Sequence, residues 1–322
     1  MKAMLASVIQ GPRDVALKEV PMPEPAEGEI LLRMESAAVC GSDLGVYAHG
    51  AVARPGRELV PGCSGHEFLG RVIASRSTEF QEGQRVLAMP PLGNGWAEYL
   101  TIPDRCSIPA PEDLEAEIAL QAQQLGTILH ALRPVGSLID KSVAIVGLGP
   151  AGRHFLGQVL GMGARTVVGF ERRAARRTAA EHLGLDAVVD AEDLAAVQDA
   201  TAHMAPGPDL VIDAAGGQEA IDLTYQLARP QGAILRFGLP HGATTLDHNI
   251  VLRKEVVAYH AVGAQAEPRL ACFRLAMRMI ERGQVDVAPL ISHSLPLDRL
   301  PEALELADNR HGNAIKVMIK PL

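Results

Sequence analysis

The chain has 322 residues, of which 48% are hydrophobic and 21% charged, and its formal net charge is −8. This length suggests about two domains with sizeable cores. The acidic balance argues against nucleic acid as a general partner, since a phosphate backbone attracts an excess of basic residues. The apolar stretches are strand-sized and the N-terminal apolar region is short, so we expect no membrane partner and no signal peptide. Four widely and unevenly spaced cysteines indicate reduced thiols or ligands in a cytoplasmic protein rather than a disulfide framework.

Residues 1–125 predict a β-rich domain. Short alternating runs are separated there by Pro- and Gly-rich clusters, a pattern typical of strands joined by irregular loops. The expected strands lie at Met4–Val8, Val15–Val20, Ile30–Met34 and Arg71–Ile73.

Residues 126–264 predict a different architecture, in which strands alternate with helices. Such alternation indicates an α/β fold with a doubly wound parallel sheet and helices on both faces. The expected strands lie at Val143–Val146, Thr166–Phe170, Ala187–Val189, Leu210–Ile212, Ala233–Phe237 and Val256–Tyr259. Residues 265–322 then open with an amphipathic helix near Leu270–Arg282 and continue with a strand and helix pattern.

A glycine-rich turn follows the first of these strands. Val143–Val146 leads into the sequence Gly147-Leu148-Gly149-Pro150-Ala151-Gly152, and Glu171 lies 19 residues after the last glycine. Gly147 would allow a tight turn, Gly149 would let the backbone approach a pyrophosphate, and Gly152 would let a helix pack closely on the strand. A helix that begins at Ala151 would offer N–H groups to the phosphates. The pattern predicts a dinucleotide site, and a turn that merely joins strand to helix is the alternative.

Glu171 bears on the choice of dinucleotide. A carboxylate accepts hydrogen bonds from the ribose hydroxyls of NAD, but it repels the 2′-phosphate of NADP. We therefore expect NAD. The following arginines could pair with a phosphate or form a solvated helix start. They are Arg172, Arg173, Arg176 and Arg177.

A second cluster of polar residues lies in the β-rich region. Cys40-Gly41-Ser42-Asp43 precedes Gly65-His66-Glu67, with His66 lying 26 residues after Cys40. Thiolate, imidazole and carboxylate are all zinc ligands, and a catalytic zinc needs three protein ligands and an open position. A packing role is the more common one for either Cys40 or His66 alone. Their occurrence together beside a dinucleotide motif favours a zinc site.

With these motifs, the chain resembles the medium-chain zinc-dependent alcohol and polyol dehydrogenases over nearly its whole length. The matching segments are CGSD, GHE, GLGPAG, Asp209–Gly217, Gly232–Pro240 and the C-terminal PLDRLPEALELA. The resemblance implies a GroES-like β domain, built from both chain ends, around a central Rossmann domain. It also implies a homodimer or homotetramer.

The resemblance further implies roles for individual residues. Cys40 and His66 would ligate the catalytic zinc, and Glu67 would adjoin the metal and exchange in and out of its coordination sphere. Asp43 would orient the imidazole of His66, and Ser42 would bind the substrate oxygen and open the proton path. On the cofactor side, Thr127 would approach the nicotinamide ring, with Gly238 and Leu239 on its opposite side.

Three features depart from the family pattern. The segment 83–100 leaves no room for the four-cysteine structural zinc lobe, so we expect one zinc rather than two. The third ligand position holds Gln123, a neutral amide, and Cys63 is an alternative ligand through its C-x-x-H spacing to His66, with loop packing as the competing interpretation. The histidine that commonly ends the proton relay aligns with Gly45, so His49 or a chain of waters would take the proton.

The expected reaction is hydride transfer between a secondary alcohol and NAD, assisted by zinc as a Lewis acid. The CGSD and GHE forms favour a polyol, sugar or cyclitol-like substrate. A zinc-free reductase of a carbonyl or activated double bond, using NADH or NADPH, is the alternative that would explain Gln123 and Gly45 together. A non-catalytic protein that senses dinucleotides is a further alternative.

Overall fold

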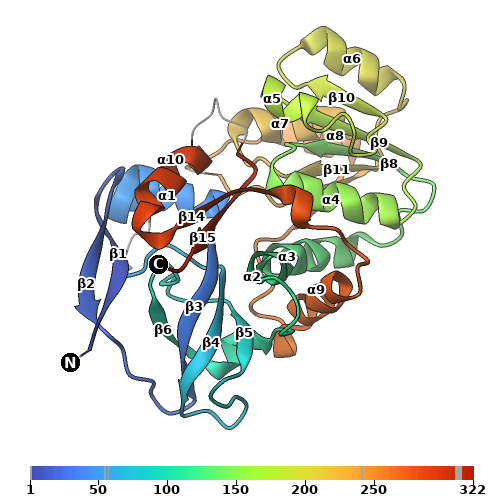
Figure 1. The fold of residues 1–322 in the computed structure, drawn as a ribbon. Helices are drawn as coiled ribbons and strands as arrows, with labels where there is room; N and C mark the ends of the chain where they lie inside the picture. Colours follow the sequence, from blue (N-terminus) through green and yellow to red (C-terminus); the bar gives the residue numbers. More distant parts are fainter. Residues whose placement is uncertain (1, 54–55, 57, 241, 309–313) are drawn as a thin grey trace. The chain divides into compact units, whose positions relative to one another are not determined.

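The structure is a computed structural model in which the chain divides into two compact units (Figure 1). Unit 1 comprises Met1–Gly126 and Ala264–Leu322, and unit 2 comprises Thr127–Gly263. Among the residues described, no helix is both long and apolar enough to cross a bilayer. The described residues are 2–53, 56, 58–240, 242–308 and 314–322.

Unit 1 consists mainly of strands, as the alternating runs predict. Its strands are β1 (Ala3–Gly11), β2 (Asp14–Pro21), β3 (Glu29–Val39), β4 (Phe68–Ser75), β5 (Arg85–Ala88), β6 (Tyr99–Pro103), β7 (Ser107–Pro109), β14 (Ile291–Pro296) and β15 (Lys316–Lys320). Its helices are α1 (Gly41–His49), α2 (Ala116–Leu120), α9 (Ala271–Glu281) and α10 (Leu300–Asp308), and α3 (Ala122–Leu132) continues into unit 2.

Strand β3 is the centre of the larger sheet of unit 1. The strand order is β14-β15-β3-β4-β5-β7, and β6 pairs with another part of β3. The last strand of the chain, β15, is therefore a direct neighbour of β3, so the two ends of the sequence form one sheet. Strands β1 and β2 form a separate antiparallel pair.

The core of unit 1 lies against this sheet. Ile30 and Leu32 of β3, Phe68 of β4, Val86 of β5 and the single tryptophan, Trp96, are each at most 1% exposed. Burial of a large apolar side chain contributes about 1.5–3 kcal/mol relative to exposure. Residues from both chain segments share this core, so the C-terminal segment is part of the fold rather than an appendage.

Unit 2 alternates strands and helices. Its strands are β8 (Ser142–Val146), β9 (Thr166–Glu171), β10 (Ala187–Asp190), β11 (Leu210–Asp213), β12 (Ala233–Arg236) and β13 (Val257–His260). Its helices are α4 (Pro150–Gly161), α5 (Ala174–Thr178), α6 (Leu194–Ala202), α7 (Gln218–Leu227) and α8 (His248–Lys254). The remaining short helical turns of the described chain are of the 3-10 type and lie at Gly50–Ala53, Asp104–Cys106, Arg133–Val135, Pro268–Leu270, Ala288–Leu290 and Leu297–Arg299.

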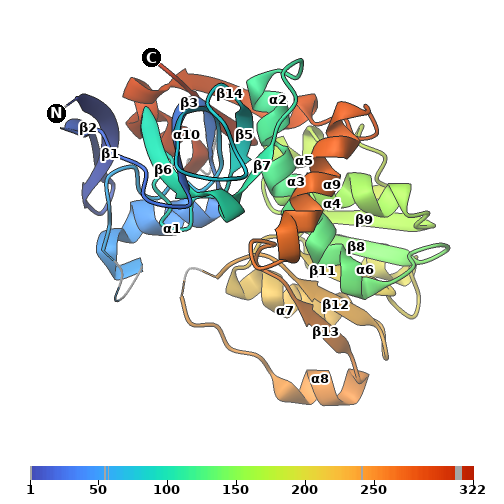
Figure 2. The ribbon, with the colours of Figure 1, turned by 90° about the horizontal axis from the view of Figure 1, so that it is seen from below.

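The sheet of unit 2 confirms the predicted doubly wound architecture. All six strands are parallel, in the order β10-β9-β8-β11-β12-β13. Figure 2 shows β9, β8, β11, β12 and β13 in this order. Alternate side chains face opposite layers of helices: Ile145 packs in one cluster with Phe155 of α4, whereas Val146 packs in the other with Ile221 of α7. The chain reverses its direction of winding between β8 and β11, which is where sheets of this kind bind ligands.

The glycine-rich turn follows β8 at this switch point. Gly147 has a φ of +95°, which glycine adopts without strain. A Cβ on Gly152 would lie 1.9 Å from the carbonyl oxygen of Gly147, so only glycine lets α4 start so close to the strand. The helix begins at Pro150 rather than at the expected Ala151, because the fixed φ of proline suits the first helical position, where its missing N–H is not needed.

We predict that Gly152→Ala lowers the free energy of unfolding by about 2 kcal/mol, because the new methyl group overlaps the Gly147 carbonyl. Gly157→Ala in the same helix is the matched control. A Cβ there meets no atom within 4 Å, so helix propensity should keep this variant as stable as the wild type or raise its stability by up to about 1 kcal/mol. Urea unfolding measures both, and equal midpoints for the two variants would contradict the prediction.

Candidate active site

Three neighbouring strand ends of unit 1 bring polar residues together. Strand β3 ends at Val39, directly before Cys40, and β4 begins directly after Glu67. Strand β15 begins at Lys316 on the other side of β3, with Val317 opposite Val39. Because β4 and β15 are both hydrogen-bonded to β3, the sheet places Cys40, Glu67 and Lys316 near one another.

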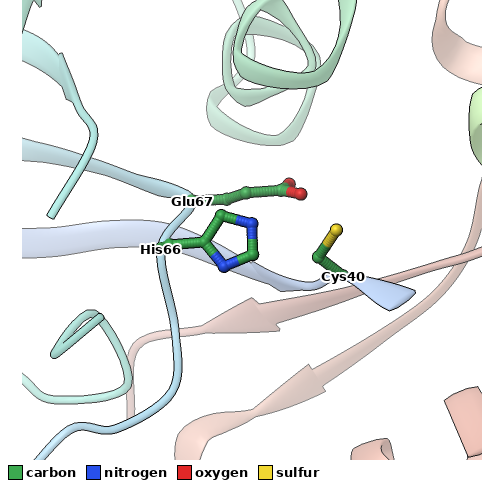
Figure 3. A group of neighbouring side chains, drawn as sticks. All are labelled: Cys40, His66 and Glu67. Atoms are coloured by element: carbon green, nitrogen blue, oxygen red, sulfur yellow. The ribbon is translucent and has the colours of Figure 1, made fainter. Parts of the chain in front are cut away.

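Cys40, His66 and Glu67 point toward one another (Figure 3). One possible ligand atom from each residue, a sulfur, a ring nitrogen and a carboxylate oxygen, lies within 4.8 Å of the other two. Cys40 is a half-buried free thiol, and the side chain of Glu67 is only 1% exposed. The structure therefore brings together the three residues that the sequence nominates as metal ligands.

Asp43 connects the parts of this cluster. Its side chain is fully buried, and its Oδ2 accepts a hydrogen bond from the backbone N–H of Cys40 at 2.9 Å. Its Oδ1 lies 3.1 Å from Nδ1 of His66 and accepts the hydroxyl hydrogen bond of Ser64 at 3.0 Å. Burial lowers the pKa of His66, but the Asp43 carboxylate outweighs this effect and raises it well above its usual value. With Nδ1 held by Asp43, Nε2 is the nitrogen that a metal ion would bind, in place of the proton that the raised pKa favours in the metal-free protein.

Lys316 is paired with Glu67 in the same interior. Its Nζ donates to Oε1 of Glu67 at 2.6 Å, and both side chains are 1% exposed. Burial alone would lower the pKa of Lys316, but the charge of Glu67 and of other nearby anionic groups raises it above its usual value. Oε2 of Glu67 is buried and has no hydrogen-bond partner among the described residues.

These donors fit a zinc ion. Thiolate sulfur, imidazole nitrogen and carboxylate oxygen are its usual protein ligands. A buried carboxylate oxygen without a partner is costly unless something else satisfies it. Oε2 of Glu67 is such an oxygen, and it belongs to the same cluster as the thiol and the imidazole. Cys40, His66 and Glu67 are the residues that would hold the ion.

The loop before His66 is held by close packing. A Cβ on Gly65 would lie 2.6 Å from Cδ1 of the buried Trp96, and one on Gly62 would lie 2.2 Å from the carbonyl oxygen of Asn94. Both positions therefore require glycine. Through the contact with Gly65, the buried Trp96 side chain helps to position the backbone of the next residue, His66.

Other residues nominated in this unit lie in varied surroundings. Ser42 is half-buried in the first turn of α1, and His49 is exposed at the end of the same helix. Gln123 is 3% exposed in α3, and Cys63 is 1% exposed. No metal-binding group found among the described residues includes Cys63, whose carbonyl oxygen accepts the hydroxyl hydrogen bond of Ser7. Cys63 is therefore not part of the Cys40, His66 and Glu67 cluster.

In unit 2, Glu171 clamps the glycine-rich turn. The side chain lies at the end of β9 and the residue is only 5% exposed. Oε2 accepts the backbone N–H of Leu148 at 2.9 Å, and Oε1 accepts that of Arg173 at 3.0 Å. A carboxylate oxygen has more than one lone pair, so these bonds leave acceptor capacity for a ligand. Glu171 therefore has a structural role in the turn that sequence reasoning did not foresee.

Arginine side chains surround the same turn. Nε of Arg153 donates to the carbonyl oxygen of Leu148 at 3.1 Å, and Nη1 of Arg176 would lie 3.2 Å from a Cβ on Gly149. Burial lowers the pKa of both guanidinium groups, an effect that the charge of Glu171 opposes. Arg177 instead pairs with Asp190 at 2.7 Å, and Arg172 is exposed. The turn is thus lined by more positive than negative charge, which suits a phosphate group.

The loops after β11 and β12 are packed together beside the turn. A Cβ on Gly238 would lie 2.2 Å from the backbone nitrogen of Gly216, so these two backbones touch. Asp213 fixes them, because its Oδ1 accepts the N–H of Gly216 and its Oδ2 the Nε–H of Arg236. Leu239 is 44% exposed in the loop after β12, and Thr127 is 7% exposed in α3.

Two family models match the sequence. The alcohol dehydrogenase GroES-like domain matches residues 26–112, and the zinc-binding dehydrogenase domain matches residues 156–282, so together they span well over half of the chain. The chain belongs to the medium-chain zinc-dependent dehydrogenases. Unit 1 is accordingly the GroES-like domain and unit 2 the Rossmann domain of this family, which confirms the predicted fold class.

Individual relatives match nearly the whole chain. The L-threonine 3-dehydrogenase of Bacillus velezensis is 27% identical, with 95% of each chain covered. The sorbitol dehydrogenase of Bos taurus is 26% identical, with 98% of this chain and 96% of its own covered. Among solved structures, the alcohol dehydrogenase of Thermus sp. ATN1 is similar at a TM-score of 0.85 and 26% identity, covering 99% of this chain and all of its own. The protein is therefore an oxidoreductase, and the zinc-free reductase alternative is not favoured.

Sequence reasoning missed two residues of this dehydrogenase site. Ser64 gives no signal beyond its place before Gly65-His66-Glu67. Lys316 gives a weak one, since it is a lysine within the otherwise apolar run from Ala314 to Ile319. A lysine at a position of this kind is expected to be exposed unless it has a buried partner, and the sequence does not identify that partner.

We predict that Asp43→Asn lowers the free energy of unfolding by about 2 kcal/mol and speeds zinc loss to a chelator about tenfold. The new amide nitrogen is itself a donor, and it would face a group that now donates to Asp43. That group is either the Cys40 N–H or the pair formed by the Ser64 hydroxyl and the His66 ring. Asp104→Asn is the control, because the carboxylate of the half-buried Asp104, in the same unit, accepts the Ser77 hydroxyl and no other hydrogen bond among the described residues. Equal stability and zinc retention in both variants would contradict the prediction.

Proposed function

We propose that the protein transfers hydride between a secondary alcohol and NAD, using one zinc ion held by Cys40, His66 and Glu67. The observation that carries the proposal is that the thiol of Cys40, the ring of His66 and the carboxylate of Glu67 converge. Oε2 of that carboxylate is buried and has no hydrogen-bond partner among the described residues. When bound, zinc supplies a Lewis acid that lowers the pKa of a substrate alcohol. Asp43 holds the His66 ring so that Nε2 is the nitrogen directed at the ion.

The proton of the alcohol leaves through Ser42. This hydroxyl lies in the first turn of α1, two residues after Cys40. His49 lies seven residues further, on the same face of the helix, since seven residues make almost two turns. His49 is exposed, so it can pass a proton to solvent through intervening water. In this relay His49 takes the part of the family's relay histidine, whose aligned position holds Gly45 in this chain.

The glycine-rich turn of unit 2 binds the dinucleotide. The backbone at Gly149 and the first turn of α4 face the pyrophosphate, and Arg176 adds positive charge there. Glu171 accepts the ribose hydroxyls of NAD in addition to its two backbone bonds. The nicotinamide is the hydride acceptor. Thr127, Gly238 and Leu239 are proposed to lie around that ring.

The substrate is proposed to be a polyol, sugar or cyclitol-like alcohol. The names of the relatives support a secondary alcohol, since threonine at C3 and sorbitol both carry hydroxyl groups on secondary carbons, and sorbitol and erythritol are polyols. Gln123, whose amide is neutral, is proposed as a polar group near the substrate rather than as the third ligand, a role that Glu67 fills. A cytoplasmic location and a homodimeric or homotetrameric state stay predictions.

We predict about one zinc ion per chain, measured by elemental analysis of purified protein. Cys40→Ser should lose the zinc and the turnover while it keeps NADH binding, because the dinucleotide turn lies in the other unit. Cys106→Ser is the control, since this half-buried thiol lies outside the cluster. Active wild-type protein without zinc would refute the proposal, and zinc loss in Cys63→Ser would show that Cys63 is a ligand.

We predict that kcat/KM is higher with NAD than with NADP, and that Glu171→Ser shifts the ratio toward NADP by about tenfold or more, equivalent to about 1.4 kcal/mol. Glu171→Ser also removes the two carboxylate oxygens that accept the backbone N–H groups of Leu148 and Arg173, so its general effect on folding needs a control. Asp186→Ser provides one, because Asp186 accepts the N–H of Val167 at the other end of β9. A wild-type preference for NADP, or an equal shift in both variants, would contradict the prediction.

A further inference from the structure

Glu67 has two carboxylate oxygens in different situations. Oε1 receives the Lys316 ammonium at 2.6 Å, whereas Oε2 is buried without a partner among the described residues. Lys316 is the first residue of β15 and Glu67 directly precedes β4, and these two strands flank β3 on opposite sides, so the lysine spans the end of β3 to reach the carboxylate. The pairing of β15 and β4 with β3 therefore brings the two side chains together.

The ammonium limits what Glu67 can do. A lysine is a point donor, so it engages one oxygen and leaves the other available, unlike an arginine, whose planar fork engages both. It also draws on the negative charge of the carboxylate at a site where solvent does not screen it, because both side chains are 1% exposed. A metal ion beside Glu67 therefore meets one oxygen of a partly neutralised anion.

We propose that Lys316 is a positioning residue that restricts Glu67 to a single-oxygen contact with the metal. Its ammonium also reduces the negative charge that the Glu67 carboxylate offers to the ion. This inference rests on the proposed zinc site. A zinc ion that receives less anionic charge is a stronger Lewis acid and a more labile one. Lys316 thus lowers the affinity of the site for the metal and raises the Lewis acidity of the bound ion. In the absence of metal it also supplies the countercharge that a buried Glu67 needs.

The test substitutes Lys316 in two directions. Lys316→Met should free both oxygens of Glu67, so the zinc should leave to a chelator about tenfold more slowly than in the wild type. Lys316→Arg should engage both oxygens and compete with the ion, so zinc should leave about tenfold faster. Lys320→Met is the control on the same strand, because Lys320 is 54% exposed and lies 3.6 Å from Glu117, outside the cluster.

Cobalt(II) in place of zinc gives a readout that general destabilisation does not reproduce. The visible d–d bands of cobalt weaken when a fifth donor joins four, so they should weaken in Lys316→Met and stay at wild-type strength in Lys320→Met. The turnover number of Lys316→Met should fall as its metal is held more tightly. That opposite change in affinity and activity is specific to a positioning role.

Wild-type zinc retention and cobalt bands in both Lys316 variants would overturn the role of Lys316 and leave the zinc site intact. If Lys316→Met does not fold, Lys316→Arg decides alone, and a zinc loss rate equal to that of the wild type overturns the proposal. Wild-type protein that binds neither zinc nor cobalt would refute the proposed function itself. The failures of the two proposals are therefore distinguishable.

Discussion

The buried carboxylate of Asp43 makes the interactions on which the candidate metal-binding cluster of Cys40, His66 and Glu67 depends. It joins the backbone of Cys40 to the side chains of Ser64 and His66, which lie more than twenty residues away in the sequence. A fully buried carboxylate is tolerated only when hydrogen bonds satisfy it, and here three donors do so. The same bonds fix the His66 ring and the start of α1, so the energetic requirement of one buried charge aligns the thiol with the imidazole.

The second constraint is charge balance in the interior of unit 1. Glu67 and Lys316 form an ion pair at 2.6 Å that is almost completely removed from water. Such pairs seldom raise stability over an apolar alternative, because desolvation offsets much of their attraction. Their value here is functional. The pair holds a carboxylate in place beside the candidate metal-binding cluster, where an apolar residue could offer no ligand.

The local motifs of this protein could be predicted, and the long-range pairings could not. The segments Cys40–Asp43 and Gly65–Glu67 and the glycine-rich turn are short motifs whose chemistry is explicit in the residue types, and the family resemblance joins the first two. The alternation of strands and helices predicts the winding of unit 2. Lys316 meets Glu67 only through the register of β15 on β3, across 249 residues. A single sequence does not specify that register. The sequence shows a lysine within an apolar run, but it does not identify Glu67 as the partner of that lysine.

Glu171 shows the same limit on a smaller scale. Its spacing from the glycines predicts a carboxylate at the ribose, yet the spacing does not reveal that both oxygens already accept backbone N–H groups. Because those bonds hold Leu148 and Arg173, the residue that would select the cofactor also shapes the loop that would bind the phosphates. Selectivity and loop geometry are therefore physically coupled at Glu171, and a substitution there changes both. The neighbouring Arg153 completes this coupling, since it holds the carbonyl of the same Leu148 whose N–H Glu171 accepts.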